Sequence, residues 1–261
     1  MKKGIKPIIG VEMYIAEKEA ELREGKNFHL ILLAKNETGY KNLLKISSYG
    51  FVKGFYYKPR VDKKFLKEHS EGVIALSACM AGEIPYHILN GEFEKAEESL
   101  KEYLEIFSKE NFFIELQDNG VPGQKELNEK LYQMAVENGL EVVATNDVHY
   151  VHKGDDVLQD IMVCIQTGSK VSDVNRMRID TEEIYLKSRE QMMEVLGKYK
   201  GAIENSVKIA KLCNLEIEFG KFKFPHYDVP EGERDINSYI RTLVKQGVAK
   251  RYGENISQEV R

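Results

Sequence analysis

Asp147 and His149 stand two residues apart, directly after an apolar, β-branched run, in the stretch 141–150, EVVATNDVHY. A buried strand that carries a carboxylate and an imidazole at its carboxyl end is one way in which a β/α barrel enzyme presents metal ligands. Residues i and i+2 of an extended chain point to the same side, so both side chains can face one point. An isolated Asp-x-His pair is more typical of a turn followed by a half-buried histidine. The metal hypothesis therefore depends on whether other strands bring ligands to the same place.

Three further residues of metal-ligand type lie in or beside predicted strands. Glu12 interrupts the apolar stretch 5–16, where a carboxylate is costly unless it is paired or bound to a metal. His29 lies in the apolar run 28–34, and Cys79 follows a third apolar run. Alone, the histidine is typical of a core residue with one hydrogen bond, and the cysteine of a small buried apolar side chain. Together with the Asp-x-His pair, they predict one metal-binding pocket built from four strands.

The elements that must position these side chains follow from hydrophobic periodicity. Two helices with a 3.6-residue period separate the later strands, and Asn36, Ser188 and Asp235 are predicted helix N-caps. Strands that alternate with helices indicate a parallel α/β arrangement. The predicted strands cover residues 5–16, 28–34, 72–77, 111–116 and 141–150, and the two helices cover 92–109 and 124–138.

The composition limits the classes of function. The chain has 261 residues, of which 42% are hydrophobic, enough for a sizeable core. The net charge of −4 gives no general attraction to phosphate backbones. Three widely spaced cysteines do not form a disulfide framework and indicate a reducing compartment. Since no apolar run approaches membrane length, we expect a cytoplasmic protein without a membrane partner.

A loop rich in basic and aromatic residues, GFVKGFYYKPRVD at 50–62, is a second candidate site. Tyr57, Lys58 and Arg60 could contact a DNA strand by stacking and by charge. A solvated loop packed by its own aromatic residues explains the same pattern equally well.

Several stretches in sequence order carry a resemblance to a known family. They include GIKPIIGVEMYIA, FHLILLAKNETGYKNLLKISS, GVIALSACMAGEIP, NFFIELQDNG and EVVATNDVHYV. The chain resembles the PHP (polymerase and histidinol phosphatase) domain of the α subunits of bacterial DNA polymerase III. EIYLKSREQMMEVL and INSYIRTLVKQGVAKRYG resemble the segment that leads from that domain toward the polymerase palm.

The resemblance implies a distorted, TIM-like β/α barrel of the PHP type with seven strands, whose mouth holds up to three metal ions through nine ligands. Glu12, His29, Cys79, Asp147 and His149 match family ligands, position by position. The other four ligands come from an N-terminal His-x-His motif, a following acidic residue and a Thr-Asp-His segment, none of which occurs in this sequence. We therefore expect an incomplete barrel, a fragment that lacks the first two strands and the polymerase core. Residues 1–221 would form the truncated PHP domain, and residues 222–261 a linker and the first helix toward the palm.

The implied chemistry is metal-dependent hydrolysis of a phosphate ester, which in some polymerases is a 3′→5′ exonuclease that proofreads. The mixed ligand set suits zinc, with manganese or iron as alternatives, and magnesium would serve the polymerase domain. By resemblance, Asp147 and Glu12 are the catalytic candidates: Glu12 as a bridging carboxylate, Asp147 as a ligand of the ion that activates water. His29 and His149 would be imidazole ligands, and Cys79 a terminal thiolate.

The parent chain would be a DNA-directed DNA polymerase, a nucleotidyltransferase, and this fragment alone is expected to be inactive. Its partners would be DNA and other holoenzyme subunits, namely the proofreading subunit and, through regions outside this chain, the sliding clamp. Two alternatives stay open at this point. One is a free-standing phosphoesterase resembling histidinol phosphatase, and the other is a non-catalytic docking module for the proofreading subunit.

Overall fold

The computed structural model describes residues 4–222, 224–253 and 258. Its contacts divide the chain into two compact units, Met1–Glu216 and Ile217–Arg261, whereas the sequence predicts a boundary after residue 221. Parts of the predicted linker and last helix segment, residues 223, 254–257 and 259–261, lie outside the described residues, as does the start of the chain at 1–3.

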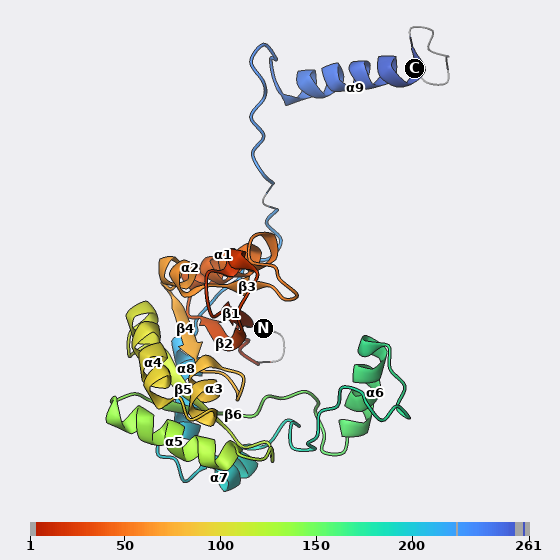
Figure 1. Ribbon diagram of the computed structural model, residues 1–261. Coiled ribbons are helices and arrows are strands. Elements are labelled where there is room, and N and C mark those ends of the chain that lie inside the picture. The colour runs from red at the N-terminus through yellow and green to blue at the C-terminus, as the bar shows by residue number, and fades with distance from the viewer. Residues whose placement is uncertain (1–3, 223, 254–257, 259–261) are drawn as a thin grey trace. The chain divides into compact units, whose positions relative to one another are not determined.

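One six-stranded sheet forms the centre of the first unit (Figure 1). The strand order is β3-β1-β2-β4-β5-β6. β4, β5 and β6 run parallel to one another, β1 is parallel to β3, and β2 is antiparallel to both of its neighbours. The strands are β1 (Gly10–Ala16), β2 (Asn27–Ala34), β3 (Arg60–Val61), β4 (Val73–Leu76), β5 (Phe112–Gln117) and β6 (Val142–Thr145).

The prediction of an all-parallel sheet is wrong at β2. Only a short connection with a 3-10 turn at Ala20–Leu22 joins β1 to β2, and a parallel pair needs a crossover of a dozen or more residues. β3 is two residues long, too short to be detected from a period-2 pattern. The α/β class is confirmed, but seven strands and a closed barrel are not: among the described residues the sheet has six strands, with β3 and β6 at its two ends.

The helices begin where the sequence places their caps. The side chain of Asn36 accepts a hydrogen bond from the amide of Gly39, and Ser188 and Asp235 each form a capping box, so all three predicted N-caps are confirmed. The helices are α1 (Glu37–Val52), α2 (Lys63–Glu68), α3 (Glu83–Leu89), α4 (Phe93–Phe107), α5 (Gln124–Glu137), α6 (Asp156–Thr167), α7 (Arg189–Leu196), α8 (Ala202–Leu212) and α9 (Ile236–Tyr252).

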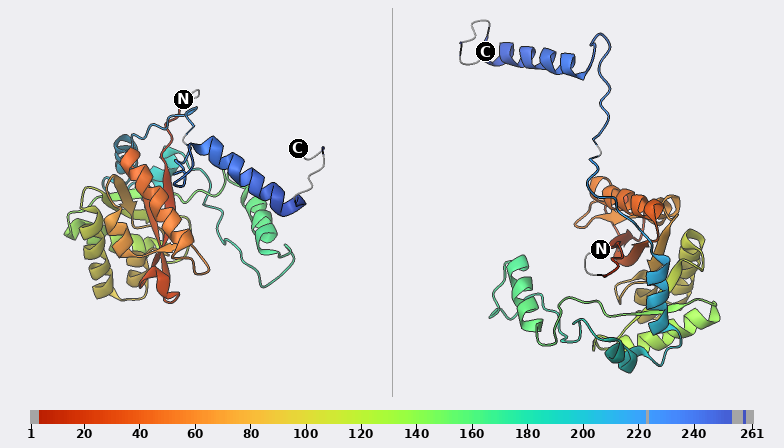
Figure 2. Two further views of the ribbon diagram at one scale, coloured as in Figure 1. Left: turned by 90° about the horizontal axis from the view of Figure 1, so that it is seen from above. Right: turned by 180° about the vertical axis from the view of Figure 1, so that it is seen from behind.

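The two faces of the sheet pack against different helices (Figures 1 and 2). On one face, alternate residues of the strands form the main core with α1, α3, α4 and α5. On the other face, Ile74, Phe113 and Val143 pack against two residues: Ile209 in α8 and Cys213, which directly follows α8. Because side chains alternate along a strand, this second face also carries polar residues, among them Glu12, His29, Glu115 and Thr145.

The second unit consists of an extended segment followed by α9. Apolar side chains of α9, Ile236, Ile240 and Leu243, are exposed. In the part of the chain that the structure describes, none of the helices has the length and apolar character needed to cross a membrane.

Candidate metal centre

Glu12 and His29 meet across the antiparallel pair β1–β2. The register sets His29 opposite Tyr14 and Glu12 opposite Ile31, so Glu12 and His29 are diagonal neighbours on one face. Oε1 of Glu12 lies 2.9 Å from Nδ1 of His29. The ring of Tyr14 packs edge-on against the imidazole, with 4.9 Å between ring centroids. The antiparallel direction of β2 therefore places an imidazole from the start of one strand beside a carboxylate in the middle of another.

Cys79 reaches the same histidine from the turn after β4. The chain turns sharply at Ala78, whose φ of 64° is in the left-handed region. The backbone amide of His29 then donates to the carbonyl of Ala81 at 2.9 Å. A Cβ at Gly82 would lie 2.0 Å from the carbonyl oxygen of Ser77, so this turn requires glycine. The result brings Sγ of Cys79 to 3.7 Å from Nδ1 of His29.

These contacts change the acid–base behaviour of the pair. Hydrogen bonds with Cys79 and Glu12 raise the pKa of His29 to about 10, despite partial burial that acts in the opposite direction. The hydrogen bond with His29 lowers the pKa of Glu12, and the charge of His149 adds to this effect. In the metal-free chain, His29 is therefore protonated and Glu12 ionised near neutral pH.

Asp147 and His149 lie in a loop after β6 rather than in an extended strand. Asp147 has a left-handed φ of 48°, so the i, i+2 geometry expected from the sequence is not formed. Nδ1 of His149 lies 2.7 Å from the backbone oxygen of Asp147 and 3.9 Å from its Oδ1. The amide of His149 donates to the carbonyl of Ile184 at 2.8 Å, which ties the loop to the extended segment before α7.

The five predicted ligands are brought together in two groups. Within residues 4–222, 224–253 and 258, no three or more His, Cys, Asp or Glu side chains are placed so that together they could hold one metal ion. The donors themselves suit zinc, which accepts thiolate, imidazole and carboxylate. A sulfur and an imidazole nitrogen bound to one tetrahedral zinc lie about 3.5 Å apart, close to the 3.7 Å between Cys79 and His29. The assignment of all five residues as ligands stays a prediction.

Glu115 is a polar residue of this region that the sequence reasoning did not select. It lies in β5, between the strands that lead to Cys79 and Asp147, and is 4% exposed. Burial raises the pKa of Glu115, while hydrogen bonds from Thr145 and Gln117 oppose the rise. A signal for it was present, because a carboxylate inside the apolar run FFIEL is as costly as the one at Glu12.

The three candidate residues of the basic-aromatic loop differ in their exposure to solvent. Arg60 is fully buried, and its guanidinium donates to the backbone oxygens of Ala20 and Gly54 at 2.7 and 3.2 Å. This corrects the prediction that its side chain contacts DNA, since a buried cation that supports the β3 end of the sheet is not free to do so. Tyr57 and Lys58 are exposed. Nζ of Lys58 lies 5.6 Å from the centroid of the Tyr14 ring, on the side of the sheet that carries His29. DNA contact by Tyr57 and Lys58 stays a prediction.

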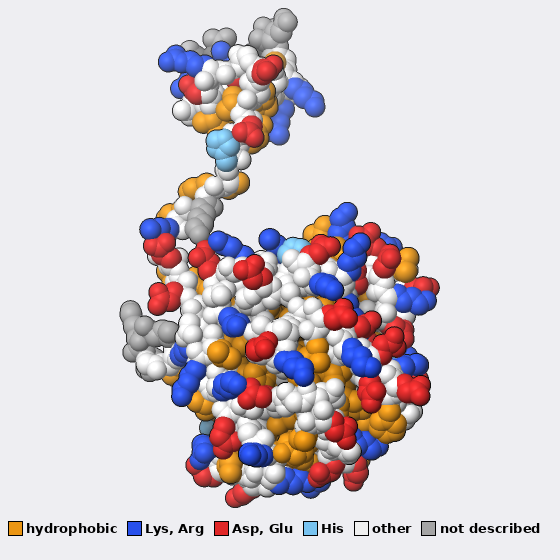
Figure 3. All heavy atoms as spheres, turned by 90° about the vertical axis from the view of Figure 1, so that its left-hand side faces the viewer, with side chains coloured by type: hydrophobic (Ala, Val, Ile, Leu, Met, Phe, Trp, Pro, Cys, Tyr) orange, Lys and Arg blue, Asp and Glu red, His pale blue; other side chains and the backbone are white. Residues whose placement is uncertain are grey.

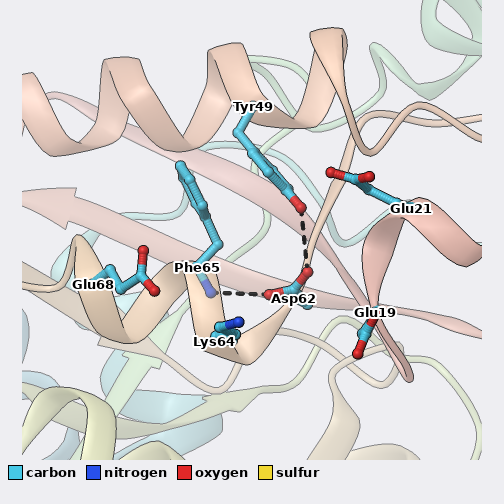
Figure 4. A pocket seen from close by; sticks show the side chains of 7 residues that line it. All are labelled: Glu19, Glu21, Tyr49, Asp62, Lys64, Phe65 and Glu68. Atoms are coloured by element: carbon cyan, nitrogen blue, oxygen red, sulfur yellow. Dashed lines mark hydrogen bonds between the residues drawn. The ribbon is translucent and has the colours of Figure 1, made fainter.

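A pocket lies beside the β3 end of the sheet (Figure 4). It has a volume of about 350 Å³ and is lined by Glu19, Glu21, Tyr49, Asp62, Lys64, Phe65 and Glu68. Asp62 accepts hydrogen bonds from the amide of Phe65 and the hydroxyl of Tyr49. Four carboxylates against one ammonium would repel a phosphate, so this pocket does not suit a phosphate ester.

One face of the molecule is mixed in charge. Basic and acidic side chains are interspersed over the face shown in Figure 3, as the net charge of −4 leads one to expect. Attraction of a phosphate must therefore come from local groups rather than from a broad basic field.

A comparison with protein families matches residues 1–119 to the PHP domain. This range contains Glu12, His29 and Cys79 and ends before Asp147 and His149. The resemblance expected from the sequence is confirmed over that part of the chain.

Curated proteins similar to the chain carry the name DNA polymerase III subunit alpha. The protein from Treponema pallidum is 43% identical over 99% of this chain and 22% of its own length. Those from Borreliella burgdorferi and Thermus aquaticus are 42% and 40% identical, over 100% and 98% of this chain and 23% and 22% of their own lengths. The chain thus spans between a fifth and a quarter of the length of these relatives and is similar to them almost from end to end.

Proposed function

We propose that this chain, whose residues 1–119 match the PHP domain, is the PHP region of a DNA polymerase III α subunit and carries a metal-dependent phosphoesterase site. One observation carries the proposal: Glu12 and Cys79 both approach Nδ1 of His29, at 2.9 and 3.7 Å, in a chain 43% identical to such a subunit. The chain is then part of a replicative DNA-directed DNA polymerase. Residues 1–221 form its PHP part, and residues 222–261 lead toward the palm.

Glu12, His29, Cys79, Asp147 and His149 are the residues that would hold divalent metal, with zinc preferred and manganese or iron as alternatives. When bound there, a divalent ion lowers the pKa of water and withdraws charge from a phosphoryl oxygen. The chain's own contribution is to present the donors. For Nδ1 of His29 to bind a cation, it must lose the proton that it shares with Glu12 and Cys79 in the metal-free chain.

Lys58 is the residue proposed to hold the phosphate group of a nucleic acid. It is exposed and lies over the ring of Tyr14, which in turn packs against His29. An ammonium at this position supplies a point charge for one phosphate, and Tyr57 offers an exposed ring for a base. These contacts support a DNA strand as substrate and 3′→5′ exonuclease proofreading as the activity.

The wider assignment follows from the names of the relatives. We propose that the parent protein works in the cytoplasm on DNA, with the proofreading subunit and the sliding clamp as holoenzyme partners and magnesium at its polymerase centre.

Metal analysis of the purified 261-residue chain tests the proposal. We expect bound zinc, manganese or iron by mass spectrometry, and a large loss of it in Cys79→Ala and in Asp147→Asn. Cys213→Ala is the matched control, because it removes a buried thiol that packs against the second face of the sheet through α8. Metal content equal to that of the control in both test variants would refute the ligand assignment.

A non-catalytic docking role is the second candidate. It is favoured by the absence, within the described residues, of any group of three or more ligand side chains arranged for one ion. Hydrolysis of an activated phosphodiester by the metal-loaded full-length subunit, lost in Asp147→Asn, would exclude this role. Metal binding by the full-length subunit without any hydrolysis would support it.

A further inference from the structure

Glu115 lies on β5, the middle one of three parallel strands. The two outer strands, β4 and β6, lead to candidate ligands. The chain after β4 leads to Cys79, and the chain after β6 leads to Asp147. β5 pairs with both strands, and its register sets Glu115 beside Val143. Both ligand-bearing turns contain a non-glycine residue in the left-handed region, Ala78 at φ 64° and Asp147 at φ 48°. Such turns persist only where surrounding contacts hold them.

Two hydroxyl groups connect Glu115 to these turns. The backbone amide of Glu115 donates to Oγ of Ser77 at 2.8 Å, and Ser77 is two residues before Cys79. The hydroxyl of Thr145 donates to Oε1 of Glu115, and Thr145 is two residues before Asp147. Gln117 reinforces the second link, because its amide donates to Oε1 of Glu115 at 3.0 Å and to Oγ1 of Thr145 at 3.3 Å. The backbone of Glu115 therefore contacts the Ser77–Cys79 turn and its side chain contacts the Thr145–Asp147 turn. The backbone of Ala78, in the first turn, also interacts with the carboxyl of Glu115, as the smallest of the influences on its pKa.

Burial of the Glu115 carboxyl lowers the stability of the fold, so its presence needs an explanation. The side chain is buried, and its second oxygen, Oε2, has no hydrogen-bond partner among the described residues. It borders a cavity of about 10 Å³ that Cys79 also lines, about the size that a single water molecule needs. An apolar side chain would avoid the cost of burying this carboxyl.

We propose that Glu115 is a positioning residue that fixes the Ser77–Cys79 turn through its backbone and the Thr145–Asp147 turn through its side chain. The proposal deepens the metal-dependent function proposed above and rests on it for its purpose. The hydrogen bonds themselves are properties of the metal-free chain. Groups that orient metal ligands in this way typically change metal affinity about 10- to 100-fold when they are removed.

Two variants of similar size separate the hydrogen bond from the volume of the side chain. Glu115→Gln keeps an oxygen that can accept from Thr145, and Glu115→Met has none. In the metal-free 261-residue chain we expect Glu115→Met to speed amide hydrogen exchange in residues 145–149 about tenfold. Residues 77–79 should change less than residues 145–149, because the backbone bond to Ser77 persists and only the smaller interaction of the carboxyl with the backbone of Ala78 is lost. Glu115→Gln should restore most of the protection.

A second variant keeps the proposal testable if Glu115→Met does not fold. Thr145→Val removes the same bond from the other partner, and it should speed exchange in residues 145–149 in the same way. Glu83→Gln is the control, since Glu83 is a buried carboxylate bonded to Ser99 and Tyr103 near α4. Exchange in residues 145–149 no faster in Glu115→Met or Thr145→Val than in this control overturns the positioning role.

Zinc affinity, measured by competition with a chelator, separates this inference from the proposed function. We expect Glu115→Met to bind zinc at least tenfold more weakly than Glu83→Gln. Wild-type affinity in Glu115→Met would overturn the inference and leave the metal site intact. Absence of zinc binding by the wild-type chain would refute the proposed function and, with it, the role of Glu115 in ligand positioning.

Discussion

The candidate centre has two halves that the fold holds in different ways. Glu12, His29 and Cys79 are held by paired strands and by a turn bonded to β2, although up to 67 residues separate them in sequence (79 − 12). Asp147 and His149 are two residues apart, yet a loop with a left-handed backbone holds them. Exposure does not separate the halves, because the side chains of His29 and Glu12 are 22% and 44% exposed and those of His149 and Asp147 are 35% and 41% exposed. The halves differ in the backbone that holds them, which is paired strands in one and a loop in the other.

The strongest way to break the strand-held half is to remove Arg60. Its guanidinium bonds to the backbone of Ala20, Glu24 and Gly54. β3 pairs with β1 at Tyr14 and Ile15. We expect Arg60→Met to lower the free energy of unfolding by about 3 kcal/mol or more, because several buried carbonyl groups lose their donor. Urea denaturation measures the change. Lys58→Met, at an exposed neighbour, should stay within about 0.5 kcal/mol, and equal effects of the two variants would contradict the structural role of Arg60.

The pairing of Glu12 with His29 should make stability depend on pH in the metal-free chain. The pKa of His29 is raised from 6.5 to about 10, so its contribution is complete below pH 6.5 and is lost as the pH rises through about 10. The pKa of Glu12 is lowered from 4.5, so its contribution is present above that pH and is lost as the pH falls. We expect Glu12→Gln to cost about 1–2 kcal/mol near pH 6, a value kept small because Glu12 is partly exposed.

This difference between wild type and Glu12→Gln should shrink as the pH approaches 10. Nuclear magnetic resonance titration should also show a lower pKa for His29 in the variant, although Cys79 continues to raise it. Glu97→Gln, on the exposed side of α4, is the control for removal of a surface carboxylate. A constant difference across this pH range would show that the ionised pair does not hold the strands.

A substitution in the loop-held half should change the free energy of unfolding in the opposite direction. Asp147 has a left-handed φ, which glycine adopts without strain. We expect Asp147→Gly to raise the free energy of unfolding of the metal-free chain by about 0.5–1 kcal/mol. Asp147→Asn should change it little, because asparagine tolerates this region. Both variants should lose metal, so that stability and binding separate. A clear loss of stability in Asp147→Gly would show that the carboxylate, not the backbone, holds this loop.

The smallest effect is expected where the loop-held half meets solvent. Lys153 pairs with Glu183 at 2.8 Å, with side chains 59% and 34% exposed. Because solvent and salt screen such a pair, Lys153→Met should leave the urea midpoint unchanged within error. Lys187 is the contrasting case, since its side chain is 2% exposed and pairs with the same glutamate. A marked shift in Lys153→Met would show that surface charge, rather than the backbone bond between His149 and Ile184, fixes the loop.

Much of the fold could be predicted from local patterns. The five expected strands and the caps at Asn36, Ser188 and Asp235 are present, because each depends on a few neighbouring residues. The direction of β2 was predicted wrongly, and the existence of β3 was not predicted. Both depend on how a short connection and a two-residue pairing fit the rest of the sheet, which no local pattern encodes.

The candidate site divides in the same way. The residue types at Glu12, His29, Cys79, Asp147 and His149 indicated a metal from the sequence alone, since carboxylate, imidazole and thiolate share few other uses in apolar strands. Arg60 is a basic residue in a basic-aromatic loop, which is typical of a DNA contact. Only its burial showed that it supports the sheet. Glu115 lies inside an apolar run as His29 does, but its contacts with Ser77 and Thr145 depend on three strands at once.

Residue types and apolar runs specify which chemical groups are available and which strands carry them. Tertiary packing selects which of these groups meet. It joined Glu12, His29 and Cys79 through an antiparallel register, and it turned Asp147 and His149 into a loop. The physical reason is that side-chain chemistry belongs to single residues, whereas a distance between residues far apart in the chain is fixed only by backbone pairing and packing.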